Sequence, residues 1–309
     1  MGVQAGMKYR LTHRTLYHYA HHVGIGLHFM HLLPRARPGQ LVHAATLVIL
    51  PKPADRVDEQ DHFGNRTSLI AQMSAHKSLD VVLHAEIEVS LPRAPEPEAS
   101  MAWEETSKAA FRAPEAAEFR YPSALASPDE AIALYAAQHF PPGQPIMVGL
   151  LSLMAGIHAD MAYRPGVTAV STTAIEALKT RAGVCQDYAH LMIACLRALD
   201  LPARYVSGYL RTYPPPGETA RRGADQSHAW IGAWLGPHDG WVDFDPTNNL
   251  VVHDEHVTLA WGRDFGDVSP LRGVILGGGR HSLTVEVDLQ PINEEESRDA
   301  AYVSGDSGI

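Results

Sequence analysis

The first third of the chain alternates between apolar and polar residues and is rich in β-branched side chains. Such a period of two is typical of strands that bury one face. The clearest runs are residues 8–12, 45–50 and 79–89. Turn residues, among them Pro51 and the pair Gly64-Asn65, separate the runs. The pattern therefore predicts an antiparallel β domain over residues 7–95, with a β-sandwich as the expected architecture.

The pattern changes after this region. Pro92, Pro95 and Pro97 lie among alanine and glutamate and mark a linker. From about residue 100 to residue 161 the chain is rich in Ala and Glu, which predicts helices interrupted by prolines. Residues 291–309 are acidic and rich in small side chains, and we expect a disordered tail there.

A second helical pattern carries a cysteine at its start. Apolar residues between Tyr188 and Leu199 recur at helical spacing, and Leu201-Pro202 ends the run. Gly183 lies where the chain must turn into this helix, which places Cys185 in the first turn. A helix N-terminus carries partial positive charge and free N–H groups, which favour a thiolate and can also bind an oxyanion.

A thiol nucleophile also needs a base. Asp187 and His190 lie about 200° and 140° round the helix from Cys185, so neither is well placed. His228 lies in a strand-like run, residues 227–235, and a turn at residues 236–240 leads into a return strand.

The return strand, residues 241–247, brings two aspartates back toward His228. A symmetric turn would leave Asp245 about three residues from the position opposite His228, so the register stays open. Asp243 and Asp245 share one face of the strand, and either carboxylate can reach the imidazole. Cysteine, histidine and aspartate together form the nucleophile, base and orienting group of acyl transfer.

Composition narrows the class of protein. The 309 residues are 45% hydrophobic and 19% charged, which is typical of a globular chain, and two domains are expected. The net charge of −10 argues against a nucleic-acid partner. No secretory signal and no apolar window of 18 residues is found, so we predict a cytoplasmic protein without membrane contact.

The cysteines and histidines predict no disulfide and no metal site. Cys185 and Cys195 are the only cysteines, and both are expected to be free thiols in a reducing compartment. Cys195 lies amid Leu and Met and is predicted to be core. The chain has 18 histidines, several of them between His18 and His31, but no His-Glu-x-x-His or Cys-x-x-Cys motif. We therefore expect no metal and no cofactor.

Three short runs resemble the signature blocks of the bacterial transglutaminase-like family. They are residues 183–187, 227–230 and 241–247. Asp61-His62-Phe63-Gly64-Asn65 is similar to a turn of that family's N-terminal domain, and residues 262–265 with 272–274 are similar to its C-terminal block. The resemblance extends over roughly residues 8–290.

This resemblance implies an α+β fold. A papain-like core would span residues 96–290, with the cysteine-bearing helix packed on an antiparallel sheet that carries the histidine and the aspartate. Cys185 would be the nucleophile, His228 the base and Asp245 the third member, with Asp243 as the rival. Members of this superfamily include peptidases, amidases, transglutaminases and inactive binding scaffolds.

The resulting hypothesis is acyl transfer from an amide through a thioester at Cys185. Hydrolysis of a peptide or amide substrate is favoured because water is always present, and transfer to an amine by a transglutaminase is the alternative. A non-catalytic peptide-binding or assembly module is the third possibility. The backbone N–H of Cys185 would bind the oxyanion together with Gln186, Tyr163 or a further backbone N–H.

Overall fold

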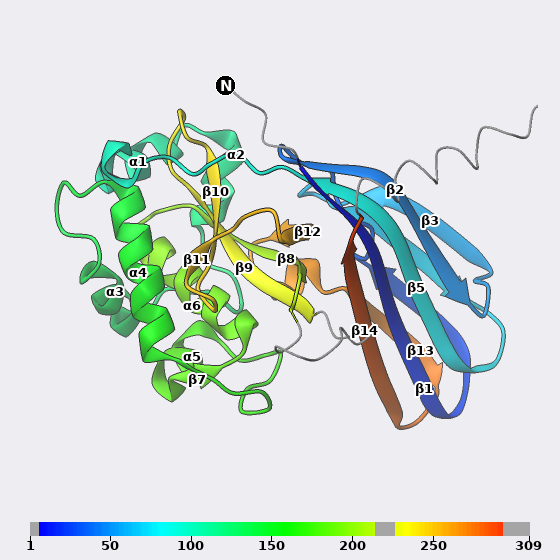
Figure 1. The fold of residues 1–309 in the computed structure, drawn as a ribbon. Helices are drawn as coiled ribbons and strands as arrows, with labels where there is room; N and C mark the ends of the chain where they lie inside the picture. Colours follow the sequence, from blue (N-terminus) through cyan, green and yellow to red (C-terminus); the bar gives the residue numbers. More distant parts are fainter. Residues whose placement is uncertain (1–5, 214–225, 293–309) are drawn as a thin grey trace, which may run out of the picture.

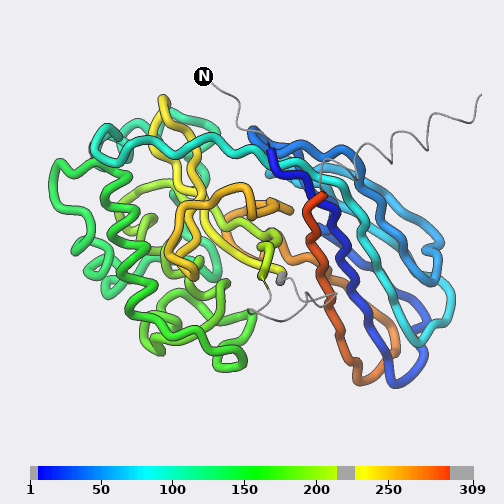
Figure 2. Tube along the Cα trace, viewed as in Figure 1, coloured from blue at the N-terminus to red at the C-terminus, as the bar shows by residue number. Residues whose placement is uncertain are grey.

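The computed structural model describes residues 6–213 and 226–292. It contains a sheet of long strands, here called the N-terminal sheet, and a core in which helices pack against a second sheet (Figures 1 and 2). The mixed α+β class is confirmed. Among the described residues, no helix combines the length and the apolar character needed to cross a membrane.

The N-terminal sheet is built around one strand. Its strands are β1 (Met7–Met30), β2 (Gln40–Leu50), β3 (Asp55–Gln60), β4 (Arg66–Gln72), β5 (His76–Val89), β13 (Leu271–Gly277) and β14 (His281–Pro291). The order is β2-β5-β1-β4-β3, and β13 and β14 also pair with β1. The first half of β1 pairs with β5 and β14, and its second half pairs with β4 and β13. The predicted antiparallel β domain therefore forms one curled sheet that continues through β1.

The predicted boundary of the core at residue 290 is wrong. Strands β13 and β14 come from the C-terminal end of the chain, but they pair with β1 in the N-terminal sheet. They cover edges of β1 that would otherwise expose unpaired backbone groups. Val287 and Leu289 are buried in the hydrophobic core of this sheet. Of the predicted tail, Pro291 belongs to β14, and residues 293–309 lie outside the described residues.

The core combines a five-stranded sheet with helices. The helices are η1 (Pro97–Ala99), α1 (Trp103–Ala110), α2 (Pro114–Ala117), η2 (Glu118–Arg120), α3 (Glu130–Ala137), α4 (Ile146–Asp160), α5 (Ala174–Thr180), α6 (Cys185–Ala198) and α7 (Phe265–Val268). The strands are β8 (Ala203–Leu210), β9 (Gln226–Trp234), β10 (Trp241–Asp245), β11 (Leu250–Val251) and β12 (His256–Gly262), in the order β11-β10-β9-β8-β12. A short parallel pair, β6 (Ala162–Tyr163) and β7 (Ala182–Gly183), precedes α6.

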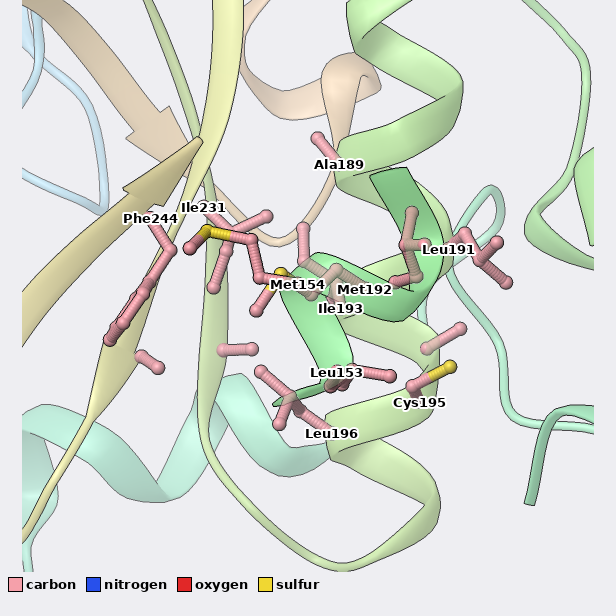
Figure 3. Close-up of a cluster of buried hydrophobic side chains, with 14 of the residues drawn as sticks. Leu153, Met154, Ala189, Leu191, Met192, Ile193, Cys195, Leu196, Ile231 and Phe244 are labelled. Atoms are coloured by element: carbon pink, nitrogen blue, oxygen red, sulfur yellow. The ribbon is translucent and has the colours of Figure 1, made fainter. Parts of the chain in front are cut away.

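Helix α6 is the most deeply buried helix of the core. All of its residues from Asp187 to Arg197 are buried, and the helix packs against α4 and the sheet. Figure 3 shows this cluster, with labelled residues Leu153, Met154, Leu191, Met192, Ile193, Leu196, Ile231 and Phe244. Each such side chain contributes about 1.5–3 kcal/mol when fully buried. Cys195 lies in this cluster, as predicted, and burial raises the pKa of its thiol. The helix is thus a rigid support for Cys185.

Two side-chain amides attach the N-terminal sheet to the core. The Gln40 amide donates to the carbonyl of Thr258 (2.7 Å) and accepts from its N–H (2.8 Å). Asn65 makes the same pair of contacts with Trp261, at 2.8 and 2.9 Å. Both partners lie on β12, the edge strand of the core sheet. The amides thus satisfy backbone groups that an edge strand would otherwise leave open.

Candidate active site

A side-chain cap builds the turn that presents Cys185. The Asp187 carboxylate accepts hydrogen bonds from the N–H of Val184 (2.8 Å) and from the hydroxyl of Thr168 (2.8 Å). A Cβ at Gly183 would lie 2.4 Å from a carboxylate oxygen of Asp187, so this position requires glycine. Cys185 is the first residue of α6, in the first turn as predicted, and it is partly exposed. Asp187 is therefore a cap of the helix rather than a base.

The hairpin of β9 and β10 brings His228 to Asp245. Phe244 pairs with Ile231, so Asp245 lies one residue further along, level with Trp230. Trp230 and His228 share a face of β9 because side chains alternate along a strand. The Nε2 atom of His228 lies 2.7 Å from Oδ2 of Asp245, and both side chains are buried.

Burial and pairing have opposite effects on this histidine. Burial lowers the pKa of His228, but its hydrogen bonds with Asp245 and Cys185 and the charges of both partners raise that pKa to about 10. Burial likewise disfavours the charged form of Asp245, but hydrogen bonds from His228 and His256 hold the pKa of its carboxyl well below the usual range. A carboxylate only accepts hydrogen bonds, so Nε2 of His228 carries the proton. Nδ1 is the nitrogen left to exchange a proton with Cys185.

Other donors also bind the Asp245 carboxylate. The backbone N–H groups of Thr247 and Asn248 donate to Oδ1 at 3.0 and 3.1 Å. The Asn248 amide donates to Oδ2 at 2.7 Å, and Nε2 of His256 lies 3.3 Å from the same oxygen. Our reading of the sequence missed Asn248 and His256. An asparagine three residues after an aspartate is a usable signal for such a turn, whereas nothing local marks His256.

The rival aspartate lies in a different cluster. Asp243 forms ion pairs with Arg37 and with Arg204, whose Nη2 lies 3.5 Å from Oδ1. It also accepts from Nε1 of Trp230 at 3.4 Å. The carboxylate that contacts His228 is therefore that of Asp245.

The two candidate oxyanion donors both lie beside Cys185. Tyr163 pairs with Gly183 in the short parallel ladder and is 49% exposed. Partial burial and the nearby charge of Cys185 raise the pKa of Tyr163. The Gln186 amide donates to the carbonyl of Val170 at 3.0 Å, so one of its N–H groups is already bound. Tyr163 has the freer donor.

His190 is separated from this chemistry. It is fully buried on α6, and its Nε2 accepts from the N–H of Phe265 at 3.2 Å. Burial lowers the pKa of His190 to about 4. The imidazole is therefore neutral at physiological pH and serves the packing of the core.

One group of three possible metal ligands occurs in the part of the chain that the structure describes. One ligand atom each from His228, Asp245 and His256 lie within 4.8 Å of one another. The hydrogen bonds on Asp245 already account for this convergence. The described histidines between His18 and His31 form no such group.

The chain is similar to several known proteins. Residues 146–246, which include Cys185, His228 and Asp245, match the transglutaminase-like superfamily, and residues 9–88 match the bacterial transglutaminase-like N-terminal region. Uncharacterized proteins from Mycobacterium tuberculosis and Mycobacterium bovis are 38% identical over 291 residues, which cover 92% of this chain and 93% of theirs.

Two further proteins are similar to this chain, one over a short segment and the other at a lower sequence identity. A protein-glutamine gamma-glutamyltransferase of Pseudomonas aeruginosa is 36% identical over 93 residues, which are 29% of this chain and 14% of that protein. The structure of a proposed cysteine protease from Cytophaga hutchinsonii has a TM-score of 0.73 at 21% identity, covering 94% of this chain and 92% of that one. The last similarity shows a shared fold. Together with the matched segments, these findings show that the chain belongs to the transglutaminase-like superfamily, with the N-terminal region of its bacterial members.

Proposed function

We propose that the protein is a cysteine-dependent acyl-transfer enzyme that acts on amide bonds through a thioester at Cys185. One observation carries this proposal. A single buried imidazole, that of His228, binds Asp245 at 2.7 Å and lies close enough to Cys185, at the start of α6, for Cys185 to raise its pKa. Nucleophile, proton carrier and orienting carboxylate thus lie in sequence along one path.

The raised pKa of His228 sets the state of the imidazole. At about 10 it keeps the ring protonated at neutral pH, next to Cys185 in the first turn of α6, where the partial positive charge of a helix N-terminus favours a thiolate over a thiol. The thiolate attacks the carbonyl carbon of the amide. Nδ1 of His228 then gives its proton to the departing amine, which leaves a thioester and a neutral imidazole. The imidazole next takes a proton from water, and the hydroxide formed attacks the thioester. This step expels the Cys185 thiolate and yields a carboxylic acid, which loses its proton to solvent.

Tyr163 is our preferred second donor to the oxyanion, beside the N–H of Cys185. Its hydroxyl is close enough for Cys185 to influence its pKa, and half of its surface is exposed. Loss of one such donor costs about 2.7–4 kcal/mol, or about 10²–10³ in kcat. A Tyr163→Phe variant should show this loss in steady-state kinetics with KM little changed, and unchanged turnover would remove Tyr163 from the mechanism. Gln186→Ala is the matched comparison.

The final acceptor distinguishes two enzyme classes. Hydrolysis of a peptide or amide is our first proposal because water reaches any open thioester. Transfer to an amine is the second, supported by the 93-residue similarity to a protein-glutamine gamma-glutamyltransferase. Glutamine-containing peptides incubated with and without a primary amine should yield a carboxylate in both cases if the enzyme is a hydrolase. An amine adduct seen by mass spectrometry would establish a transglutaminase.

The first test is alkylation by iodoacetamide from about pH 4 to pH 9, read by mass spectrometry. Wild-type Cys185 should be labelled rapidly at low pH, and His228→Ala should slow that labelling. Buried Cys195 is an internal control for unfolding, and Cys185→Ala confirms the labelled site. If Cys185 is labelled only at alkaline pH and His228→Ala changes nothing, a non-catalytic binding module replaces the enzyme.

A further inference from the structure

A second histidine binds the same carboxylate oxygen as His228. His256 is buried at the start of β12, and its Nε2 lies 3.3 Å from Oδ2 of Asp245. Burial lowers the pKa of His256, so its ring is neutral. Because Asp245 only accepts, Nε2 of His256 carries the hydrogen. Its Nδ1 has no hydrogen-bond partner among the described residues, which leaves Asp245 as the polar contact that orients the ring.

Packing fixes this ring on two sides. The Trp230 ring meets it edge-on with centroids 5.2 Å apart, and His253 meets it in the same manner at 5.2 Å. The backbone of His256 pairs with Leu210 of β8. The two rings and the paired backbone therefore restrict movement of the imidazole away from Asp245.

The N-terminal sheet holds the other side of this edge strand. Two residues after His256, both backbone groups of Thr258 bind the Gln40 amide, and the Thr258 hydroxyl accepts from Arg37 at 3.0 Å. Gln40 is buried and also donates to the carbonyl of Arg35 at 2.9 Å. The place of β12 beside the active site thus depends on residues from the other sheet.

We propose that His256 is a positioning residue that fixes Asp245 on His228, and that Gln40 holds His256 in place through Thr258. The proposal rests on the proposed function, because it assigns His256 to the same hydrogen-bonded path. A second donor on Oδ2 opposes rotation of the carboxylate away from His228. A misplacement of about 1 Å at a reacting group can reduce a rate by up to about 100-fold.

The test compares His256→Leu, which removes the donor, with His256→Gln, which keeps an N–H at a similar reach. Gln40→Ala tests the support from the N-terminal sheet, and Gln290→Ala, at an exposed glutamine of β14, is its matched control. Two quantities are measured for each folded variant. One is the titration of the His228 imidazole by NMR, assigned with His228→Ala, and the other is the rate of Cys185 alkylation against pH.

In His256→Leu we expect His228 to lose its proton about one pH unit lower than in the wild type, because a mobile carboxylate stabilises the imidazolium less. Alkylation of Cys185 at low pH should fall about tenfold. In His256→Gln both the His228 titration and the rate of Cys185 alkylation should return most of the way to the wild-type values. Gln40→Ala should lower the pH of the His228 titration by a smaller amount, and Gln290→Ala should match the wild type. A merely structural role would lower stability without moving the titration.

Three results would overturn the proposal. They are an unshifted His228 titration in folded His256→Leu, a His256→Gln variant as impaired as His256→Leu, and a Gln40→Ala variant that equals Gln290→Ala. If His256→Leu does not fold, the His256→Gln and Gln40→Ala variants still test the proposal. Slow alkylation of wild-type Cys185 at low pH would instead overturn the proposed function, while the His228 titration would still report on His256.

Discussion

Asp243 and Asp245 lie two residues apart on one face of β10, yet they belong to two different regions of the molecule. Both side chains are almost completely buried. Asp245 binds the imidazoles of His228 and His256. Asp243 binds guanidinium groups, one from Arg37 before β2 and one from β8 of the core.

The difference lies in what the partners can do with a proton. An imidazole gains and loses a proton near neutral pH, whereas a guanidinium stays charged. The carboxylate of Asp245 can therefore support a group that titrates, and that of Asp243 fixes two permanent charges where the two sheets meet. Burial disfavours the ionised form of Asp243, but Arg37 and Arg204 lower its pKa nevertheless. Asp243 and Asp245 occupy equivalent positions on the strand, so the side chains that contact each carboxylate determine its role.

Removing the charge of Asp245 should give the largest effect on activity. In Asp245→Asn the new amide can still accept from the N–H groups of Thr247 and Asn248 through Oδ1, so the turn is kept. The amide N–H would face Nε2 of His228 and favour the wrong tautomer. We expect kcat of the folded enzyme to fall by about 10⁴-fold, as for the equivalent change in a serine protease triad.

Asp254→Asn, at a half-exposed aspartate of the same region, is the control and should keep full activity. Steady-state kinetics and a thermal melt of both variants make the comparison. An Asp245→Asn enzyme within about tenfold of the wild type would place the orienting role elsewhere.

The same substitution at Asp243 should chiefly reduce stability. Asp243→Asn leaves Arg37 and Arg204 buried without their counter-charge. Removing one partner of a buried ion pair lowers the free energy of unfolding by about 3–5 kcal/mol. Chemical denaturation measures the loss. Activity of the folded fraction should fall far less than in Asp245→Asn. A second change, Arg204→Met, should recover part of the stability because it removes one unpaired charge. A stable but inactive Asp243→Asn would erase the distinction between the two aspartates.

Local sequence patterns predicted much of this arrangement. The apolar spacing after Gly183 predicted a helix that begins near Cys185, and α6 begins there. Helical geometry also predicted that Asp187 and His190 lie away from the thiol. In the structure both side chains form hydrogen bonds with other groups. These predictions succeeded because they depend on contacts within one or two turns of the chain.

The register of the hairpin could not be predicted. A symmetric turn places Asp245 opposite Ile231, which faces away from His228. The observed pairing of Phe244 with Ile231 shifts the strand by one residue and moves Asp245 to the face of His228. A shift of one residue reverses the face of every side chain in a strand.

Contacts between distant segments were also beyond the sequence. Gln40 and Thr258 are 218 positions apart, and His256 is an ordinary strand residue until the fold brings the start of β12 to the carboxylate of Asp245. The return of β13 and β14 to β1 is of the same kind. Alternation predicts that such strands exist, but it does not tell which open edge each will pair with.

Buried His13 differs from His228 because its ring contacts two hydroxyl groups and no carboxylate. Its ring nitrogens lie 2.8 Å from Oη of Tyr209 on β8 and 2.9 Å from Oγ1 of Thr15. Burial lowers the pKa of His13 to about 4, from a usual value near 6.5. The unfolded chain therefore binds more protons between these values, and the free energy of unfolding falls as pH drops from about 6.5 to 4. The loss is on the order of 3 kcal/mol.

His228 should act in the opposite direction. Its pKa of about 10 exceeds the unfolded value, so its contribution is complete below about pH 6.5 and is lost as pH rises toward 10. Denaturation between pH 4.5 and 9 should show that His13→Gln flattens the acid side and His228→Gln the alkaline side. His190 keeps part of the acid slope in both variants, since its pKa is also about 4. His238→Gln, at an exposed histidine, is the control and should have the same dependence of stability on pH as the wild type. An unaltered acid slope in His13→Gln would mean that the hydroxyl partners of His13 stabilise the charged ring as well as a carboxylate does.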